Sequence, residues 1–151
     1  MDFRRALPTD SGGIAGIEES VFPDAWNQRD ITNLICTEGS ACFVARDGES
    51  VIAYVLARLI APECEIYRVA VLPEYRQRGI GYRLLDYAIK TSRGKGLEVV
   101  FLEVRESNIA AIKLYEAYGF KKIGMRKNYY KNPTENACLM LYGNSTDLGE
   151  V

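Results

Sequence analysis

The clearest periodic pattern of apolar residues lies in the middle of the chain and predicts an amphipathic helix over residues 79–92. Its apolar residues recur at the spacing of one helix face: Ile80, Leu84, Leu85, Ala88 and Ile89. Gly94 and Gly96 then end the pattern, as glycine does at many helix C-termini. Runs rich in Val, Ile, Tyr and Phe lie on both sides of this helix, and they predict strands.

The predicted helices and strands follow one another in an order that is typical of a mixed sheet. Helices are expected at residues 9–20, 27–36, 79–92 and 108–118, and strands at 2–6, 41–46, 51–60, 65–72, 98–104, 120–125 and 137–142. Thr9 or Asp10 is placed to cap the first helix, and Asp47-Gly48 is a hairpin signal. A polar loop around Asn128 is expected between the last two strands. The predicted fold class is therefore α/β, with helices on both faces of one mixed sheet.

Length and composition indicate one globular domain, expected over residues 1–142, and a polar tail at 143–151 that we expect to be disordered. Of the 151 residues, 48% are hydrophobic and 26% charged, and the net charge of −1 gives no basic field for nucleic acid. No apolar run approaches the roughly 18 residues of a membrane span, and the N-terminus lacks the apolar core of a signal peptide. We expect a cytoplasmic protein, a monomer or weak homodimer, with no nucleic-acid or membrane partner.

Two features of the composition limit the catalytic chemistry. The chain has no histidine, which excludes Ser-His-Asp and Cys-His catalysis and the usual zinc sites, and no metal site is expected. The four cysteines form no C-x-x-C pair, and we interpret them as buried reduced thiols: Cys36, Cys42, Cys64 and Cys138. A general base must therefore be a carboxylate, a tyrosine, a lysine or a bound water.

A loop rich in arginine and glycine joins the strand at 65–72 to the amphipathic helix, and it reads Arg76-x-x-Gly79-x-Gly81. Glycine lets the backbone approach a ligand closely, and the free N–H groups and the dipole of the helix N-terminus attract an anion. Arg76, Arg78 and Arg83 add positive charge, so that a diphosphate could bind without a metal. A solvated tight turn is the alternative, because a short glycine motif is only moderately specific.

At this point the chain resembles the GNAT superfamily of N-acetyltransferases, whose pyrophosphate-binding loop the segment Arg76–Gly81 matches. Further segments resemble the branch of ribosomal-protein alanine N-acetyltransferases and archaeal protein N-terminal acetyltransferases: Leu102–Asn108, Ala110–Glu116, Gly119-Phe120 and Asn128–Tyr130. The resemblance covers residues 65–142, about half of the chain, and the motifs together are far more specific than any one of them.

The resemblance implies a fold, a cofactor and the residues that bind it. The central, mostly antiparallel sheet would splay between its fourth and fifth strands, and acetyl-CoA would enter the gap with its pantetheine arm beside the backbone of the fourth strand. The residues expected to bind acetyl-CoA are Val69, Ala70, Val71, Arg76, Gln77, Arg78, Gly79, Ile80, Gly81, Asn108 and Tyr115. Asn108 is also placed as a helix N-cap, and the two roles can coexist.

Glu103 interrupts the strand predicted at 98–104, whose two faces are otherwise apolar. A carboxylate there is costly unless it is paired or functional, and the family places its proposed general base at this position. The alternative is a structural salt bridge to Arg68 or Arg105. Tyr115 matches the family's proposed general acid, although its helical spacing alone indicates a core tyrosine.

The resemblance also implies the reaction: transfer of acetyl from acetyl-CoA to a primary amine, with the α-amine of a protein N-terminus as the leading acceptor. The residues expected to bind the acceptor are Phe22, Trp26, Arg68, Tyr129 and Tyr130. The aromatic residues among them could instead anchor helices or pack on the surface. Relatives usually carry a small polar residue near Arg68, so an arginine here would change the pocket or pair with Glu103. Two alternatives remain: acetylation of a small-molecule amine, and a non-catalytic acyl-CoA-binding sensor.

Basic residues gather near the end of the chain, with tyrosines between them: Lys121, Lys122, Arg126, Lys127 and Lys131. They could bind RNA or a ribosomal surface, or they could lie on a solvated strand edge, where lysine discourages aggregation. The net charge of −1 favours the second interpretation.

Overall fold

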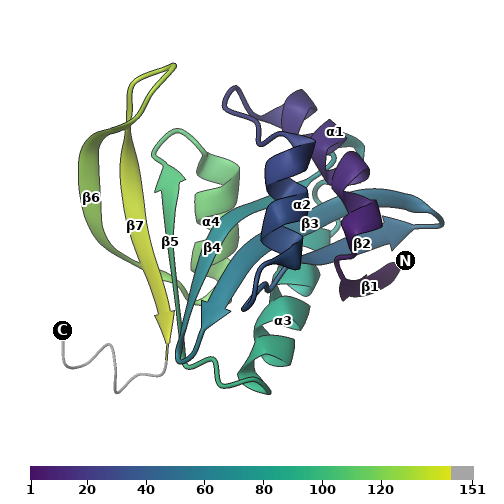
Figure 1. Ribbon diagram of the computed structural model, residues 1–151. Coiled ribbons are helices and arrows are strands. Elements are labelled where there is room, and N and C mark those ends of the chain that lie inside the picture. The colour runs from purple at the N-terminus through teal and green to yellow at the C-terminus, as the bar shows by residue number, and fades with distance from the viewer. Residues whose placement is uncertain (144–151) are drawn as a thin grey trace.

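A mixed sheet of seven strands runs through the computed structural model, which describes residues 1–143 (Figure 1). In spatial order the strands are β1 (Asp2–Arg5), β2 (Phe43–Asp47), β3 (Ser50–Ile60), β4 (Glu63–Val71), β5 (Val99–Arg105), β7 (Glu135–Gly143) and β6 (Lys121–Tyr130). All neighbouring strands are antiparallel except β4 and β5, which are parallel. The predicted α/β fold class and the mostly antiparallel sheet are therefore confirmed.

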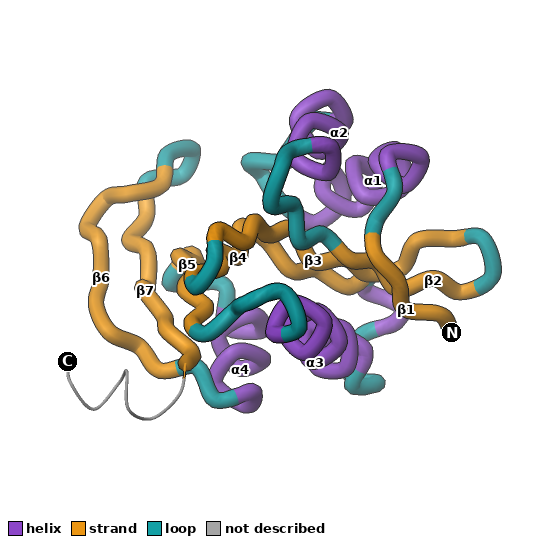
Figure 2. Tube along the Cα trace, turned by 60° about the horizontal axis from the view of Figure 1, so that its bottom comes forward, coloured by secondary structure: helices purple, strands orange, loops and turns teal. Residues whose placement is uncertain are grey.

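Helices cover both faces of the sheet, as the order of elements predicted. Helices α1 (Ser11–Val21) and α2 (Gln28–Cys36) lie on one face, and α3 (Ile80–Arg93) and α4 (Ile109–Tyr118) lie on the other (Figure 2). Two short 3-10 helices, η1 (Pro8–Asp10) and η2 (Pro73–Tyr75), precede α1 and the α3 loop. No helix within residues 1–143 is long and apolar enough to cross a membrane.

The apolar face predicted for residues 79–92 is the buried face of α3. Its apolar residues are all at most 5% exposed: Ile80, Leu84, Leu85, Ala88 and Ile89. They pack against the sheet in the larger of two hydrophobic cores, and burying a leucine or isoleucine side chain stabilises the fold by about 1.5–3 kcal/mol. A smaller core lies under α1 and α2.

The sheet opens between β4 and β5, and a bulge in β4 explains why. The two strands pair only from Glu63 to Ile66 on β4 and from Val99 to Leu102 on β5. On the other side of β4, the register with β3 skips Tyr67, the residue that follows the last parallel pair. A bulge bends its strand and increases the local twist. The C-terminal half of β4 therefore turns away from β5, which confirms the predicted splay.

The structure corrects the prediction for the end of the sheet. Asn128, Tyr129 and Tyr130 lie in β6 and not in a loop, because β6 continues to Tyr130. The ladder with β7 is irregular between Arg126 and Tyr130, and Asn128 has a φ of 53°. The backbone N–H of Asn128 donates to the side chain of Asn136 (2.9 Å), which allows a polar stretch within the strand. β6 is an edge strand, so its lysines occupy a solvated sheet edge.

Three smaller predictions also need correction. Asp10 precedes α1 but does not cap it, because its carboxylate binds Arg4 and the backbone N–H of Leu7 instead. Cys36 is exposed at the end of α2, whereas the other three cysteines are buried as predicted. Gly143 belongs to β7, and the rest of the predicted tail, residues 144–151, lies outside the described residues.

Candidate active site

The N-terminus of α3 forms an open anion cradle on one side of the gap between β4 and β5. Gly79 has a left-handed backbone (φ 75°), and the space where its Cβ would lie is empty within 4 Å. A Cβ on Gly81 would lie 3.4 Å from the side chains of Val71 and Leu114, so glycine lets α3 start close to β4 and α4. Within the described residues no side-chain hydrogen bond caps this end. Its first N–H groups are therefore available to a ligand.

Backbone contacts hold the arginines of this loop while their charges stay exposed. Arg76 donates from Nε to the carbonyl of Val71 (3.0 Å), and Arg78 donates to the carbonyl of Glu74 (3.1 Å). Gln77 between them has a φ of 62°, which is uncommon for a residue other than glycine. Such a conformation costs on the order of 1–3 kcal/mol and is often found at ligand-binding sites.

The free edge of β4 presents peptide groups to the gap. The N–H of Leu72 donates to the carbonyl of Ile52 on β3 (2.8 Å), so Leu72 directs its backbone toward β3. Because peptide groups alternate in direction along a strand, Ala70 also faces β3, whereas Val69 and Val71 face the gap. Val69 and Val71 thus fit the role predicted for them, and Ala70 lies between them with its polar backbone groups turned away.

Glu103 lies on β5 at the opposite side of the gap and is 17% exposed. Its Oε1 forms an ion pair with Nε of Arg126 (3.3 Å). Its Oε2 is buried and has no hydrogen-bond partner within residues 1–143. A buried acceptor without a partner costs about 1–3 kcal/mol, so this oxygen is suited to receive a donor from a ligand. The alternative of a salt bridge to Arg68 or Arg105 is wrong, because both arginines bind other carboxylates.

The negative charge of Glu103 influences the side chains around it. Burial, together with this charge, raises the pKa of Glu65 on the neighbouring strand. The Glu103 carboxylate also raises the pKa of Tyr129, and burial with a contribution from the same charge raises the pKa of Tyr130 to about 12. Tyr129 and Tyr130 therefore both lie near the carboxylate, and both remain protonated at neutral pH.

Tyr115 and Asn108 lie on α4, on the same face of the sheet as the anion cradle. Tyr115 is 3% exposed and packs against Phe120 with ring centroids 5.3 Å apart. Burial raises the pKa of its hydroxyl, while the charge of Arg68, on the opposite face, acts in the other direction. Asn108 caps α4, with its side-chain oxygen accepting from the N–H of Ala111 (3.2 Å). The predicted N-cap is confirmed, and Tyr115 lies in the larger hydrophobic core, as its helical spacing indicated.

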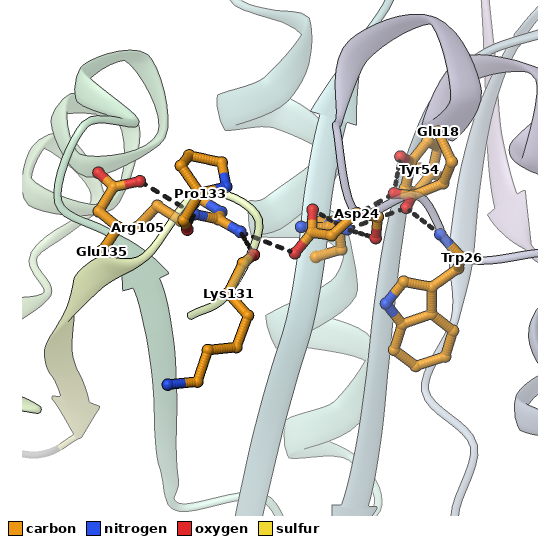
Figure 3. A network of polar contacts seen from close by, with 9 residues as sticks. Glu18, Asp24, Trp26, Tyr54, Arg105, Lys131, Pro133 and Glu135 are labelled. Atoms are coloured by element: carbon orange, nitrogen blue, oxygen red, sulfur yellow. Dashed lines mark hydrogen bonds and ion pairs between the residues drawn. The ribbon is translucent and has the colours of Figure 1, made fainter. Parts of the chain in front are cut away.

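The predicted acceptor residues of the first half of the chain gather near a buried carboxylate, that of Glu18, and Figure 3 shows Glu18 with Tyr54 and Trp26. Glu18 is 0% exposed and accepts from the hydroxyl of Tyr54, from the N–H of Trp26 (2.9 Å) and from two nitrogens of Arg68 (both 3.2 Å). The guanidinium of Arg68 lies 3.8 Å from the ring centroid of Phe22. Phe22, Trp26 and Arg68 therefore form one wall on the α1 face of the sheet.

Asp24 connects this wall to β5. Its Oδ1 lies 3.2 Å from Nη2 of Arg68, and its Oδ2 lies 3.5 Å from Nη2 of Arg105. Arg105 also donates to three acceptors in and beside the turn between β6 and β7: Lys131 O (3.0 Å), Pro133 O (3.0 Å) and Glu135 Oε1 (3.1 Å). Figure 3 shows this chain of contacts running across the gap. Asp24 thus joins the wall of Phe22, Trp26 and Arg68 to Arg105 on β5.

Sequence reasoning missed most of this network. Glu18 had a usable signal, because it lies four residues after Ile14 and one after Ile17, on the apolar face of α1. A carboxylate on such a face must find a buried partner. Asp24 had no comparable signal, since it lies in a loop, and its contacts to two strands depend on the fold.

Residues 13–120 match the acetyltransferase (GNAT) family. This match covers more than half of the chain, and the chain therefore belongs to that family. The predicted family is confirmed, and the anion cradle and the splayed strands lie within the matched residues.

Two relatives carry names that concern N-acetylation. The chain is 34% identical over 137 residues to N-alpha-acetyltransferase RimI of Mycobacterium tuberculosis. This match covers 87% of this chain and 85% of the relative. The chain is 38% identical over 90 residues to the ribosomal-protein-bS18 alanine N-acetyltransferase of Escherichia coli, which covers 58% of this chain and 61% of the relative. That second match thus spans less than two thirds of the length of the relative.

A solved structure has the same architecture. The crystal structure of the ribosomal-protein-S18-alanine N-acetyltransferase from Escherichia coli has a TM-score of 0.86 to this chain at 28% identity. The match covers 94% of this chain and 92% of that chain. The two chains therefore share the same overall fold.

Proposed function

We propose that this chain is an N-acetyltransferase that transfers the acetyl group of acetyl-CoA to the α-amine of a protein N-terminus. One observation carries the proposal: the gap between β4 and β5 has an anion cradle at one side and, at the other, a buried carboxylate oxygen that has no hydrogen-bond partner among residues 1–143. The family match and the names of the relatives support the same reaction. The four free cysteines are consistent with action in the reducing cytoplasm, as a monomer or weak homodimer.

The residues at the cradle fit acetyl-CoA, which supplies the acetyl group as a thioester. The left-handed Gly79 leaves open space at the N-terminus of α3, where N–H groups and the helix dipole favour a diphosphate. Arg76 and Arg78 lie beside this space with exposed charges. The backbone groups of Val69 and the N–H of Val71 face the gap and could pair with the amide groups of a pantetheine arm, whereas the Val71 carbonyl already accepts from Arg76 (3.0 Å).

The proposed chemical steps use Glu103, the backbone of β4 and the buried Tyr115 of α4. A peptide α-amine has a pKa of about 8, so most of it is protonated at neutral pH and a base is needed. Glu103 is placed to accept the proton through Oε2 as the amine attacks the thioester carbon. A backbone N–H of Val69 or Val71 would donate to the oxygen that becomes negative. Tyr115, held protonated by burial, would donate to the leaving sulfur.

The acceptor side favours a peptide over a small amine. Glu103 lies near Tyr129 on β6, since Arg126 contacts both side chains, and Phe22, Trp26 and Arg68 form a second wall on the α1 face. A groove between these two walls would suit an extended peptide that enters with its first residue toward Glu103. One relative is named for N-acetylation of an alanine of ribosomal protein bS18 and another as an N-alpha-acetyltransferase, and we extend that class of acceptor to this chain.

The test is turnover of acetyl-CoA, followed by release of free thiol, with matched peptides. Peptides that begin with Ala, Ser or Met are compared with the same peptides blocked at the N-terminus but containing a lysine, and with small amines. The proposal expects turnover only with free N-termini. Turnover only with small amines would contradict the proposed acceptor, and binding of acetyl-CoA without any turnover would favour a sensor.

A further inference from the structure

Arg68 and Arg105 form a site for a carboxylate, and a carboxylate of this chain occupies it. The two side chains are 13% and 10% exposed, and each directs Nη2 at Asp24 (3.2 and 3.5 Å). Asp24 is 33% exposed and lies in the loop between α1 and α2, so solvent reaches the site from the acceptor side. Paired guanidinium groups of this kind bind carboxylates strongly.

The two arginines are held in place without the carboxylate of Asp24, and Arg68 Nη2 also donates to the Asp24 backbone carbonyl (3.0 Å), which any substitution retains. Arg68 is fixed by two contacts to the buried Glu18 (both 3.2 Å) and by stacking on Phe22. Arg105 is fixed by Glu135 (3.1 Å) and by two backbone carbonyls of the β6–β7 turn. Each arginine therefore keeps an anionic partner when Asp24 is removed. The pair is preorganised for any carboxylate that can reach it.

The carboxylate site lies beside the proposed catalytic base. Arg105 follows Glu103 by two residues on β5, so their side chains share one face of the strand, about 6.5–7 Å apart along it. An acceptor amine at Glu103 Oε2 would thus bring the side chain of its own residue close to Asp24. A neutral side chain can be accommodated there. An acidic side chain would be repelled by the carboxylate of Asp24, which already pairs with both arginines.

We propose that Asp24 determines acceptor specificity: it fills the carboxylate site between Arg68 and Arg105 and thereby excludes acceptors whose first residue is acidic. The inference rests on the proposed function and names its acceptor class more closely, as proteins with a neutral first residue. Removal of the Asp24 carboxylate leaves two arginines that accept the side chain of an N-terminal aspartate. Asp24 acts here on the choice of acceptor and takes no part in proton transfer.

The experiment compares two peptides that differ only in their first residue, Asp or Asn, on wild type and on Asp24→Ala. The measured quantity is the ratio of kcat/KM for the Asp peptide to that for the Asn peptide, which cancels any general loss of activity. We expect a ratio well below one for wild type and a rise of about tenfold or more in Asp24→Ala, the size of one charge-assisted contact. Asp24→Asn should give a smaller rise, because it removes the charge but still fills the site.

The control variant is Asp86→Ala. Like Asp24, Asp86 forms an ion pair, here with Lys90, and it also accepts from the hydroxyl of Tyr118, but it lies on α3. The ratio for this variant should equal that of wild type. An unchanged ratio in Asp24→Ala, with wild type active, overturns the proposal.

A second measurement does not depend on turnover. Sodium formate should raise the Tm of Asp24→Ala more than sodium chloride at the same ionic strength, and it should do so less for wild type and for Asp86→Ala. If wild type acetylates no peptide at all, the proposed function and the role of Asp24 in acceptor choice fail together, while this measurement still decides whether Asp24 fills a carboxylate site. No formate-specific rise in Asp24→Ala would then overturn the proposed carboxylate site.

Discussion

At the gap between β4 and β5, the two faces of the sheet present different kinds of groups: mainly backbone on the α3 side and charged side chains on the α1 side. On the α3 side, the cradle consists of backbone: a left-handed Gly79, the unpaired N–H groups of a helix, and the free edge of β4. On the α1 side, the wall consists of charged side chains, with Glu18 at 0% exposure in contact with Arg68, and Asp24 between two arginines. The α3 side is open and nearly free of buried charge, whereas the wall on the α1 side is held together by buried charges.

The difference teaches where specificity can reside. A diphosphate needs a backbone conformation that glycine provides, and the identity of most other side chains there matters little. An acceptor must be distinguished from other amines, and side-chain charges in a shaped wall can do so by attraction and by exclusion. The donor side is therefore expected to tolerate changes of side chain, and the acceptor side to be sensitive to the loss of a single charge.

The largest expected effect comes from Glu103→Gln, at the point where the two sides meet. The amide cannot accept the proton of the amine, so turnover should fall about 10²- to 10⁴-fold. Affinity for acetyl-CoA, measured by calorimetry, should stay at the wild-type value, because the cradle is untouched. Glu106→Gln, an exposed carboxylate in the turn after β5, is the control and should retain activity. Wild-type turnover in Glu103→Gln would leave this carboxylate a purely structural role.

The next largest effect is on stability, and it tests the buried charge of the acceptor side. Glu18→Gln leaves Arg68 without its buried anionic partner, and breaking such a pair costs about 3–5 kcal/mol in free energy of unfolding. Urea denaturation measures the change. Glu19→Gln removes the exposed neighbouring carboxylate and should stay within about 0.5 kcal/mol of wild type. Equal effects of the two substitutions would contradict the importance of the buried network.

A pair of glycine substitutions sharpens the contrast between the two sides. Gly79→Ala places a Cβ at a φ of 75°, which should destabilise the fold by about 1–2 kcal/mol and weaken acetyl-CoA binding. Gly16→Ala, in α1 with nothing within 4 Å of the new Cβ, should stabilise the fold by about 0.5–1 kcal/mol. Thermal and urea unfolding of both variants should give changes of opposite sign. A neutral Gly79→Ala would mean that the loop does not require the left-handed conformation.

The smallest effect concerns an ion pair outside the site. Asp10 accepts from Arg4 (2.7 and 2.9 Å) and from the N–H of Leu7 (2.7 Å). Burial opposes the charged form, but these contacts outweigh it and lower the pKa of Asp10. The stabilisation is therefore complete above the unfolded pKa of about 3.9 and is lost as pH falls through the lower folded value.

Asp10→Asn should accordingly be less stable than wild type at neutral pH, and the difference should shrink in acid. Urea midpoints measured from neutral pH down to strongly acidic solution give this comparison. Asp2→Asn, at an exposed position of β1, should show little difference at any pH. A difference for Asp10→Asn that persists unchanged in acid would assign the loss to shape rather than to charge.

The contrast between the two sides also explains what could be predicted from the sequence. The cradle needs glycines at fixed spacing before an amphipathic helix, and that pattern is local, so the position of Arg76–Gly81 at the N-terminus of α3 and the buried face of α3 were predicted correctly, while the binding role of the segment stays a prediction. The splay followed from the family resemblance, because the bulge at Tyr67 leaves no mark in composition. The polar stretch at Asn128 was misplaced in a loop, since a bulged edge strand can carry the same residues as a loop.

The acceptor side was predicted only in part. Phe22, Trp26 and Arg68 were expected near the acceptor, and the structure brings them together around Glu18, which was not expected. Arg68 was expected to pair with Glu103 if it paired at all, and it binds Glu18 and Asp24 instead. Contacts of this kind join residues that are far apart in the sequence, and no local pattern encodes which charges will meet.

The most direct test of the central claim is a crystal structure of the chain with a compound in which coenzyme A is joined to the N-terminus of a short peptide. The account predicts the diphosphate at the N-terminus of α3, the linker beside Val69 and Val71, and the peptide on the α1 face with its first residue at Glu103. A peptide bound on the α3 face, or one that lies away from Glu103, would contradict the claim that donor and acceptor meet across the gap from opposite faces of the sheet.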